Sequence, residues 1–147
     1  MSLKDRIQQD VKDAMRAKEK ERLATIRLIT DAIKQREVDE RIELDDEQVL
    51  VVLDKMCKQR RESISQFEKA GRDDLIAQEV SELDIIKTYL PEQLGEDEIA
   101  AMIDTAMADT GASSIKDMGK VMGQLKPKLQ GRADMGAVSA MIKSKLT

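Results

Sequence analysis

Apolar side chains recur at intervals of three and four residues along almost the whole chain, the spacing that places them on one face of an α-helix. Seven separate stripes of this kind follow one another in the 147 residues. They predict seven amphipathic helices, within residues 2–15, 23–38, 45–70, 74–90, 96–110, 114–126 and 134–147. The predicted fold class is therefore all-α.

Several predicted helix ends carry the residues that helix ends require. Ser2, Asp45 and Asp134 precede the first, third and last helix, where their side-chain oxygens can accept hydrogen bonds from free backbone N–H groups. Gly71 follows the third helix. We expect it to end this helix, because glycine readily adopts the left-handed conformation found at helix C-termini. Pro127 is expected to end the sixth helix, because proline has no N–H to donate.

The segment from Pro91 to Gly95 interrupts the helical pattern, and it is the predicted domain boundary. Residues 1–92 form a predicted N-terminal domain of four helices, and residues 93–147 form a smaller predicted domain of three helices. We find no internal repeat and no low-complexity segment.

The composition supports a helical, globular protein. Aromatic residues make up 1% and charged residues 37% of the chain, too few aromatic side chains to fill the faces of a β-sandwich or barrel. The hydrophobic share of 41% is enough for a core. Histidine is absent, which excludes catalytic triads and zinc sites that need imidazole. A single cysteine excludes an intrachain disulfide.

The start of the chain lacks the apolar core of a secretory signal peptide. The longest apolar runs, such as 49–53, are five residues long, against the roughly twenty that a membrane-spanning helix needs. The sequence therefore predicts a cytoplasmic protein with no membrane partner.

Charge is distributed unevenly along the chain. Residues 1–90 carry 18 Lys/Arg and 21 Asp/Glu, residues 91–110 carry six acids and no base, and residues 111–147 carry seven bases and two acids. The C-terminal quarter is therefore locally basic, although the whole chain has a net charge of −4. We expect any binding of a polyanion to be local and modest.

The basic residues of this quarter stand close to glycines, which leave backbone uncovered. Such a surface can approach a phosphate chain closely. The candidate RNA-binding residues are Lys116, Lys120, Gly123, Lys126, Lys128 and Arg132. An equally weighted alternative is that Gly119 and Gly123 let two helices touch while the lysines are merely solvated.

Other candidate sites have simpler structural interpretations. Ser113 and Ser114 with Lys116 resemble a serine–lysine amidase pair, but Ser114 followed by Asp117 favours a helix cap. The acidic clusters at 45–47 and 96–98 stand at helix starts, where the helix dipole favours carboxylates. Cys57 lies at the edge of a buried helix face. The sequence therefore identifies no catalytic residue, no metal site and no cofactor.

Four motifs, in this order, resemble the GatB/YqeY family, and in particular its small stand-alone YqeY-like proteins. They are Thr25–Gln35, Phe67–Leu75, Tyr89–Leu94 and Met118–Asp134, and together they span nearly the whole chain. The resemblance implies a bacterial protein whose C-terminal three-helix domain is similar to the tail of the B subunit of the glutamine-dependent tRNA amidotransferase. In that enzyme the tail contacts the elbow of tRNA.

The resemblance leads to three hypotheses about function. The first is a non-catalytic accessory protein that binds tRNA or a tRNA-bearing enzyme complex, with the N-terminal helices as a possible surface for a protein partner. The second is participation in glutamine-dependent amide transfer, as a carbon–nitrogen ligase component. The ATP-binding core of such ligases is absent from this chain, so this hypothesis is supported by the resemblance alone. The third is a helical protein–protein adaptor.

Overall fold

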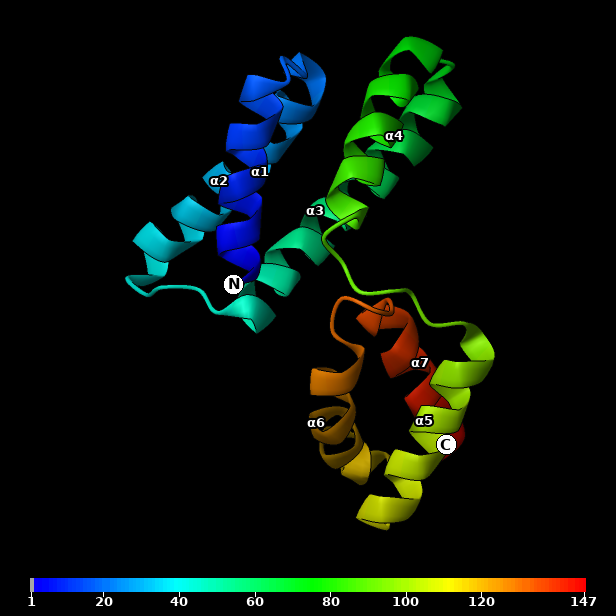
Figure 1. Ribbon diagram of the computed structural model, residues 1–147. Helices are drawn as coiled ribbons and strands as arrows, with labels where there is room; N and C mark the ends of the chain where they lie inside the picture. The colour runs from blue at the N-terminus through cyan, green and yellow to red at the C-terminus, as the bar shows by residue number, and fades with distance from the viewer. Residues whose placement is uncertain (1) are drawn as a thin grey trace. The chain divides into compact units, whose positions relative to one another are not determined.

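The computed structural model describes residues 2–147, and all regular structure in this range is helical, as Figure 1 shows. The all-α prediction is confirmed, with seven α-helices and 80% helical content in the described chain. The elements are α1 (Leu3–Arg16), α2 (Lys20–Glu40), α3 (Asp46–Ala70), α4 (Asp73–Lys87), α5 (Glu96–Thr110), the 3-10 turn η1 (Ile115–Asp117), α6 (Met118–Leu129) and α7 (Met135–Leu146).

The helices group into two compact units, which divide between Leu90 and Pro91. The N-terminal unit holds α1–α4 and the C-terminal unit holds α5–α7. This division lies two residues before the predicted boundary after residue 92. The likeness of the second unit to an amidotransferase tail stays a prediction. In the described residues no helix is both long and apolar enough to cross a membrane.

Local capping explains where α1 and α3 begin and where α3 ends. The Ser2 hydroxyl accepts a hydrogen bond from the Asp5 N–H at 3.1 Å. Asp45 and Gln48 form a reciprocal capping box at the start of α3, with bonds of 2.9 and 3.0 Å. Gly71 ends α3 with φ of +69°. The predicted start and stop signals of this unit are therefore confirmed.

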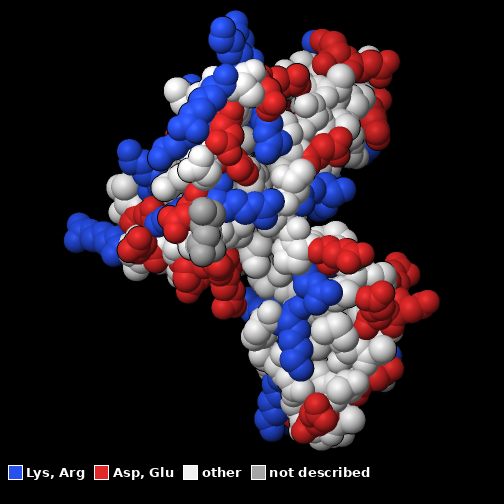
Figure 2. All heavy atoms as spheres, viewed as in Figure 1, with Lys and Arg blue, Asp and Glu red and all other residues white. Residues whose placement is uncertain are grey.

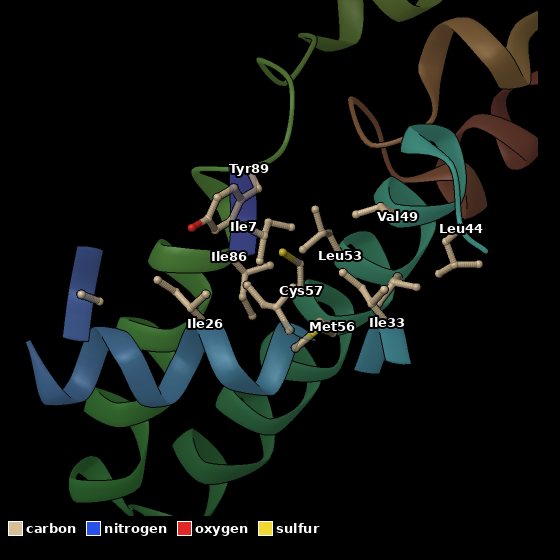
Figure 3. Packing of buried hydrophobic residues seen from close by; sticks show 13 residues of the cluster. Ile7, Ile26, Ile33, Leu44, Val49, Leu53, Met56, Cys57, Ile86 and Tyr89 are labelled. Carbon is tan, nitrogen blue, oxygen red and sulfur yellow. The ribbon is translucent and has the colours of Figure 1, made fainter. Parts of the chain in front are cut away.

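The core of the N-terminal unit joins all four helices (Figure 3). Ile7 from α1, Ile26 and Ile29 from α2, Leu53 from α3 and Ile86 from α4 are fully buried. Burial of these side chains, at about 25 cal/mol for each Å² of apolar surface, is the main force that assembles the helices. Most of the core residues of α3 come from its first half, before Lys58.

Tyr89 ties the end of α4 to α1. Its side chain is 3% exposed, and its hydroxyl donates a hydrogen bond of 2.6 Å to Asp10 Oδ2. The Arg6 guanidinium lies 5.0 Å from the centre of the tyrosine ring, within the range of a cation–π contact. Burial, followed by the bond to Asp10, raises the pKa of Tyr89 above its ordinary value.

The C-terminal unit has its own core, formed by α5, α6 and α7. Its most completely buried large side chains are Ile103, Val121, Leu125, Leu129, Val138 and Ile142. The two cores therefore form separate sets of residues, one in each unit.

The prediction that Pro127 ends the sixth helix is wrong, because α6 continues through Pro127 to Leu129. Proline at this position removes one hydrogen bond, the bond to the carbonyl of Gly123 four residues earlier. Gly123 is exposed, so water can satisfy its free carbonyl. The cost stays low because the helix ends two residues later.

Candidate functional site

The structure places the six predicted RNA-binding residues on or beside α6. Lys116 belongs to η1, Arg132 to the loop after α6, and Lys120, Gly123, Lys126 and Lys128 to α6 itself. All are exposed except Arg132, which is half-buried. Figure 2 shows the positive charge of the C-terminal unit on the side of α6 and the negative charge on the side of α5.

The lysines of α6 do not share one face. Lys126 and Lys128 are two residues apart, which turns them about 160° from each other around the helix. Lys128 lines a small hollow between α5 and α6, where Gln124 donates a hydrogen bond of 3.1 Å to Asp109. Lys116 lies in η1, the turn that directly precedes α6, whereas Lys120 lies in the first turn of α6. The cations therefore surround the exposed half of α6.

The glycines of α6 do not serve close packing between helices. A Cβ atom added at Gly119 or at Gly123 would meet no atom within 4 Å. The alternative in which these glycines let two helices touch is therefore wrong. Both positions leave uncovered backbone beside Lys120.

Arg132 has a structural role that the sequence did not indicate. Its Nε donates to the Glu92 carbonyl at 3.3 Å, and its own carbonyl accepts from the Leu94 N–H at 2.9 Å. Gln93 adds a 2.6 Å bond to the Gly131 carbonyl. These bonds fasten the segment that precedes α5 to the loop that follows α6. No local sequence signal marks them, because the partners are about forty residues apart.

The serine pair near residue 114 is a helix-start structure. The Asp117 carboxylate accepts hydrogen bonds from the backbone N–H groups of Ser113 and Ser114, at 2.9 and 3.3 Å. These two bonds lower the pKa of Asp117. The capping interpretation of this segment is confirmed.

Cys57 is completely buried in the N-terminal core, where Figure 3 shows it between Leu53 and Ile86. Loss of solvation raises the pKa of its thiol. The neutral thiol packs as a small apolar group, as its position on the helix indicated.

A hollow with a volume of about 510 Å³ lies between α2 and α3 of the N-terminal unit. We call it the α2–α3 groove. Its lining residues are Ala32, Gln35, Arg36, Asp39, Glu40, Val51, Val52, Lys55, Met56 and Gln59. The floor is apolar and the rim is polar, a combination typical of binding sites.

Some charges on the rim of the groove are neutralised within the chain and others are not. Arg36 pairs with Glu40, and its Nη1 donates to the Gln48 carbonyl at 3.3 Å, which ties α2 to α3. Neither Asp39 nor Lys55 forms an ion pair with any residue in the described range 2–147. The sequence did not reveal this groove, because its two walls belong to different helices.

The second candidate surface is the outer part of the α3–α4 pair, residues 58–85, which we call the distal hairpin. No residue of this segment is fully buried. Arg60 and Glu82 join its two helices, with 3.3 Å between Arg60 Nε and Glu82 Oε2 and side chains 15% and 14% exposed. Arg60 Nε makes no hydrogen bond within the described residues, so Arg60 and Glu82 interact as an ion pair alone. An ion pair therefore joins α3 and α4 at the place where the apolar core of the N-terminal unit would otherwise continue into the hairpin.

Comparison with known proteins identifies the family. The chain matches the family described as Yqey-like protein over residues 4–146. It is 32% identical over 130 residues to the protein named "Altered inheritance of mitochondria protein 41, mitochondrial" of Pyrenophora tritici-repentis, covering 87% of this chain and 71% of that protein. The protein of the same name from Lachancea thermotolerans is 33% identical over 143 residues, 92% of this chain and 76% of that protein. For the one from Eremothecium gossypii, 41% identity over 85 residues covers 57% of this chain and 46% of the relative.

These relatives contradict the predicted location. They are named as mitochondrial proteins, and the prediction of a bacterial, cytoplasmic protein is therefore wrong. The bacterial part of that prediction came from the family resemblance, and the cytoplasmic part depended on the lack of an apolar signal core. Mitochondrial leader peptides are amphipathic and rich in arginine and serine, so this criterion does not detect them.

The predicted function is contradicted as well. The relatives' name refers to the inheritance of mitochondria, whereas the prediction was a tRNA-binding accessory protein, with a carbon–nitrogen ligase component as one alternative. Both ideas extended the function of an amidotransferase to this chain on the strength of a resemblance to one of its domains, and even a shared fold does not by itself carry function. What the motifs and the comparisons establish together is that the chain belongs to the Yqey-like protein family.

Proposed function

We propose that the protein acts by binding another protein through the distal hairpin. The observation that carries this proposal is a row of apolar side chains along one edge of α4. Ile76, Val80 and Leu83 follow one another at intervals of four and three, so they lie on one face of the helix. Leu83, at the inner end of the row, packs partly against the core. Val80 is 39% exposed, although valine is among the residues most often buried.

The rest of the hairpin shows why this edge favours a partner. Ile64 and Phe67 on α3, with Leu75 on α4, are only half-buried. Two helices alone cannot enclose an apolar seam, and helices in proteins gain most of their stability from packing on a third element. A partner helix laid along the α4 edge would complete the seam.

Charge indicates the chemistry of the partner. Helix α4 carries five acids and one base, and Figure 2 shows acidic side chains gathered at the free end of the hairpin. Within the described residues, Asp73, Glu79 and Asp84 form no ion pair. An amphipathic helix with an apolar face flanked by Lys or Arg is therefore the partner that this surface fits best.

The first experiment places a photo-crosslinking amino acid at position 80, with position 62 as the control. Glu62 is exposed and lies on the side of α3 that faces away from α4. A protein crosslinked in cells through position 80, and not through position 62, is the candidate partner. Equal labelling from both positions, or none from position 80, would contradict the proposal.

The second experiment uses the purified partner. Val80→Asp should weaken its binding by about tenfold, the effect expected of a residue at the centre of an interface. Val38→Asp is the matched control, because it makes the same change at an exposed valine of α2. Binding should also weaken as salt rises, because the attraction between the acidic hairpin and a basic partner is screened. An unchanged affinity of Val80→Asp would overturn the assignment of this edge.

A further inference from the structure

The crest of α2 beside the α2–α3 groove carries an apolar side chain that the chain itself leaves uncovered. Leu28, Gln35 and Asp39 follow one another at intervals of seven and four, so they lie on one face of α2. Leu28 is 41% exposed, whereas Gln35 and Asp39 line the groove. A ridge with an uncovered leucine therefore stands beside a hollow with an apolar floor.

The two walls of the groove carry opposite charges. Asp39 is on the α2 wall and Lys55 is on the α3 wall. In the described part of the chain Asp39 accepts a hydrogen bond of 2.9 Å from Gln35 and forms no ion pair, and Lys55 forms none either. The groove therefore presents a carboxylate and an ammonium group, neither of which is neutralised by an ion pair within residues 2–147.

We propose that the occupant of this groove is the α2 crest of a second copy of the chain, in a two-fold symmetric dimer. A two-fold axis beside the crest would insert each ridge into the groove of the other copy, the packing of ridges into grooves that helices prefer. The same operation would bring Asp39 of each copy to Lys55 of the other. One symmetric contact would then cover two exposed leucines and form two ion pairs.

A second copy fits the groove better than an unrelated protein, because one chain supplies both the ridge and the hollow and both members of the charge pair. The surface is small, which places the dimer among weak associations, with a dissociation constant of about 10 to 100 µM. This inference uses residues different from those of the distal hairpin and goes beyond the proposed function.

Charge reversal tests the dimer by sedimentation velocity. Asp39→Lys would set two ammonium groups against each other at both contacts, and Lys55→Glu would set two carboxylates together. Each variant should weaken self-association by about tenfold, because two exposed pairs change from attraction to repulsion. Lys58→Glu is the matched control, because Lys58 is an exposed lysine of α3 outside the groove, and it should leave self-association unchanged.

Mixing the two variants supplies the decisive measurement. The chain with Asp39→Lys and the chain with Lys55→Glu repel their own copies at both contacts. In their heterodimer both contacts are attractive, because one is the original Asp39–Lys55 pair and the other is the same pair with its two charges exchanged. The mixture should therefore form a heterodimer about tenfold tighter than either homodimer. The double variant in one chain should also regain the wild-type affinity.

Three outcomes would overturn the dimer. The first is wild-type protein that stays monomeric up to about 1 mM, where such a dimer would be mostly formed. The second is a mixture no tighter than its components, and the third is a loss in Lys58→Glu equal to that in Lys55→Glu. None of these outcomes depends on the hairpin partner.

Discussion

Tyr89 offers a direct test of how the N-terminal unit is held together. Its buried hydroxyl donates 2.6 Å to Asp10 Oδ2, and ionisation would place a second negative charge beside that carboxylate. Because burial and Asp10 raise the pKa of Tyr89 above the ordinary value of 10.0, the folded state binds the phenolic proton more tightly than the unfolded state does. The stabilisation is therefore fully present below pH 10.0 and is lost as the pH rises above it.

Two magnitudes follow from this arrangement. Above the unfolded pKa, the free energy of unfolding should fall by about 1.4 kcal/mol for each pH unit until the folded pKa is reached. Tyr89→Phe keeps the ring and removes the hydroxyl. It should destabilise the protein by about 1.5 kcal/mol at neutral pH. This free energy is at the low end of the range for a hydrogen bond to a charged group. The Asp10 carboxylate stays partly compensated without the tyrosine hydroxyl, because Arg22 lies within 4.0 Å of it and part of its surface is in water.

The assay is simple, because the chain has one tyrosine and no tryptophan. Tyrosinate absorbance, followed against pH, reports Tyr89 alone, and far-UV circular dichroism on the same samples reports whether the helices stay folded. We expect no titration in the native protein near pH 10.0 and a normal titration in urea. A midpoint near 10.0 with native helical signal, or an equally steep loss of stability in Tyr89→Phe, would disprove this account of the tyrosine.

Three further predictions concern stability. Leu53→Ala should cost about 2 to 5 kcal/mol in urea unfolding, because Leu53 is fully buried, whereas Leu28→Ala at an exposed site should stay within about 0.5 kcal/mol. Gly71→Ala should cost about 1 kcal/mol because of its φ of +69°. Gly119→Ala, in a helix with open space around it, should gain about 0.5 to 1 kcal/mol; thermal unfolding that showed the same sign for both glycines would contradict this. Asp117→Asn should remove a stabilisation that the wild type has above pH 3.8 and loses on acidification, so equal pH profiles of the melting temperature would argue against the cap.

The parts of this structure that depend on near neighbours could be predicted from the sequence. Each helix contains its own apolar stripe, and each cap joins residues two to four apart, as in the pair formed by Asp45 and Gln48. The same holds for the serine pair near residue 114. Pro127 shows the limit of local rules, because whether α6 tolerates it depends on how exposed the carbonyl of Gly123 is.

The surfaces could not be predicted in this way. The basic residues on and beside α6 lie near one another in sequence, yet the turn of the helix places Lys126 and Lys128 on different faces. The bonds of Arg132 to Glu92 and Leu94 hold that residue in the loop after α6. Conversely, Asp39 and Lys55 lie on different helices, far apart along the chain, and line one groove.

Local sequence was enough to establish that this protein is helical and where most helices begin and end, because short-range hydrogen bonding and helical periodicity set these properties. Which polar and apolar residues remain exposed beside one another is instead a consequence of how α2, α3 and α4 pack. The contacts between these helices cover some faces of each and leave others open to a partner, and no stretch of neighbouring residues contains that information.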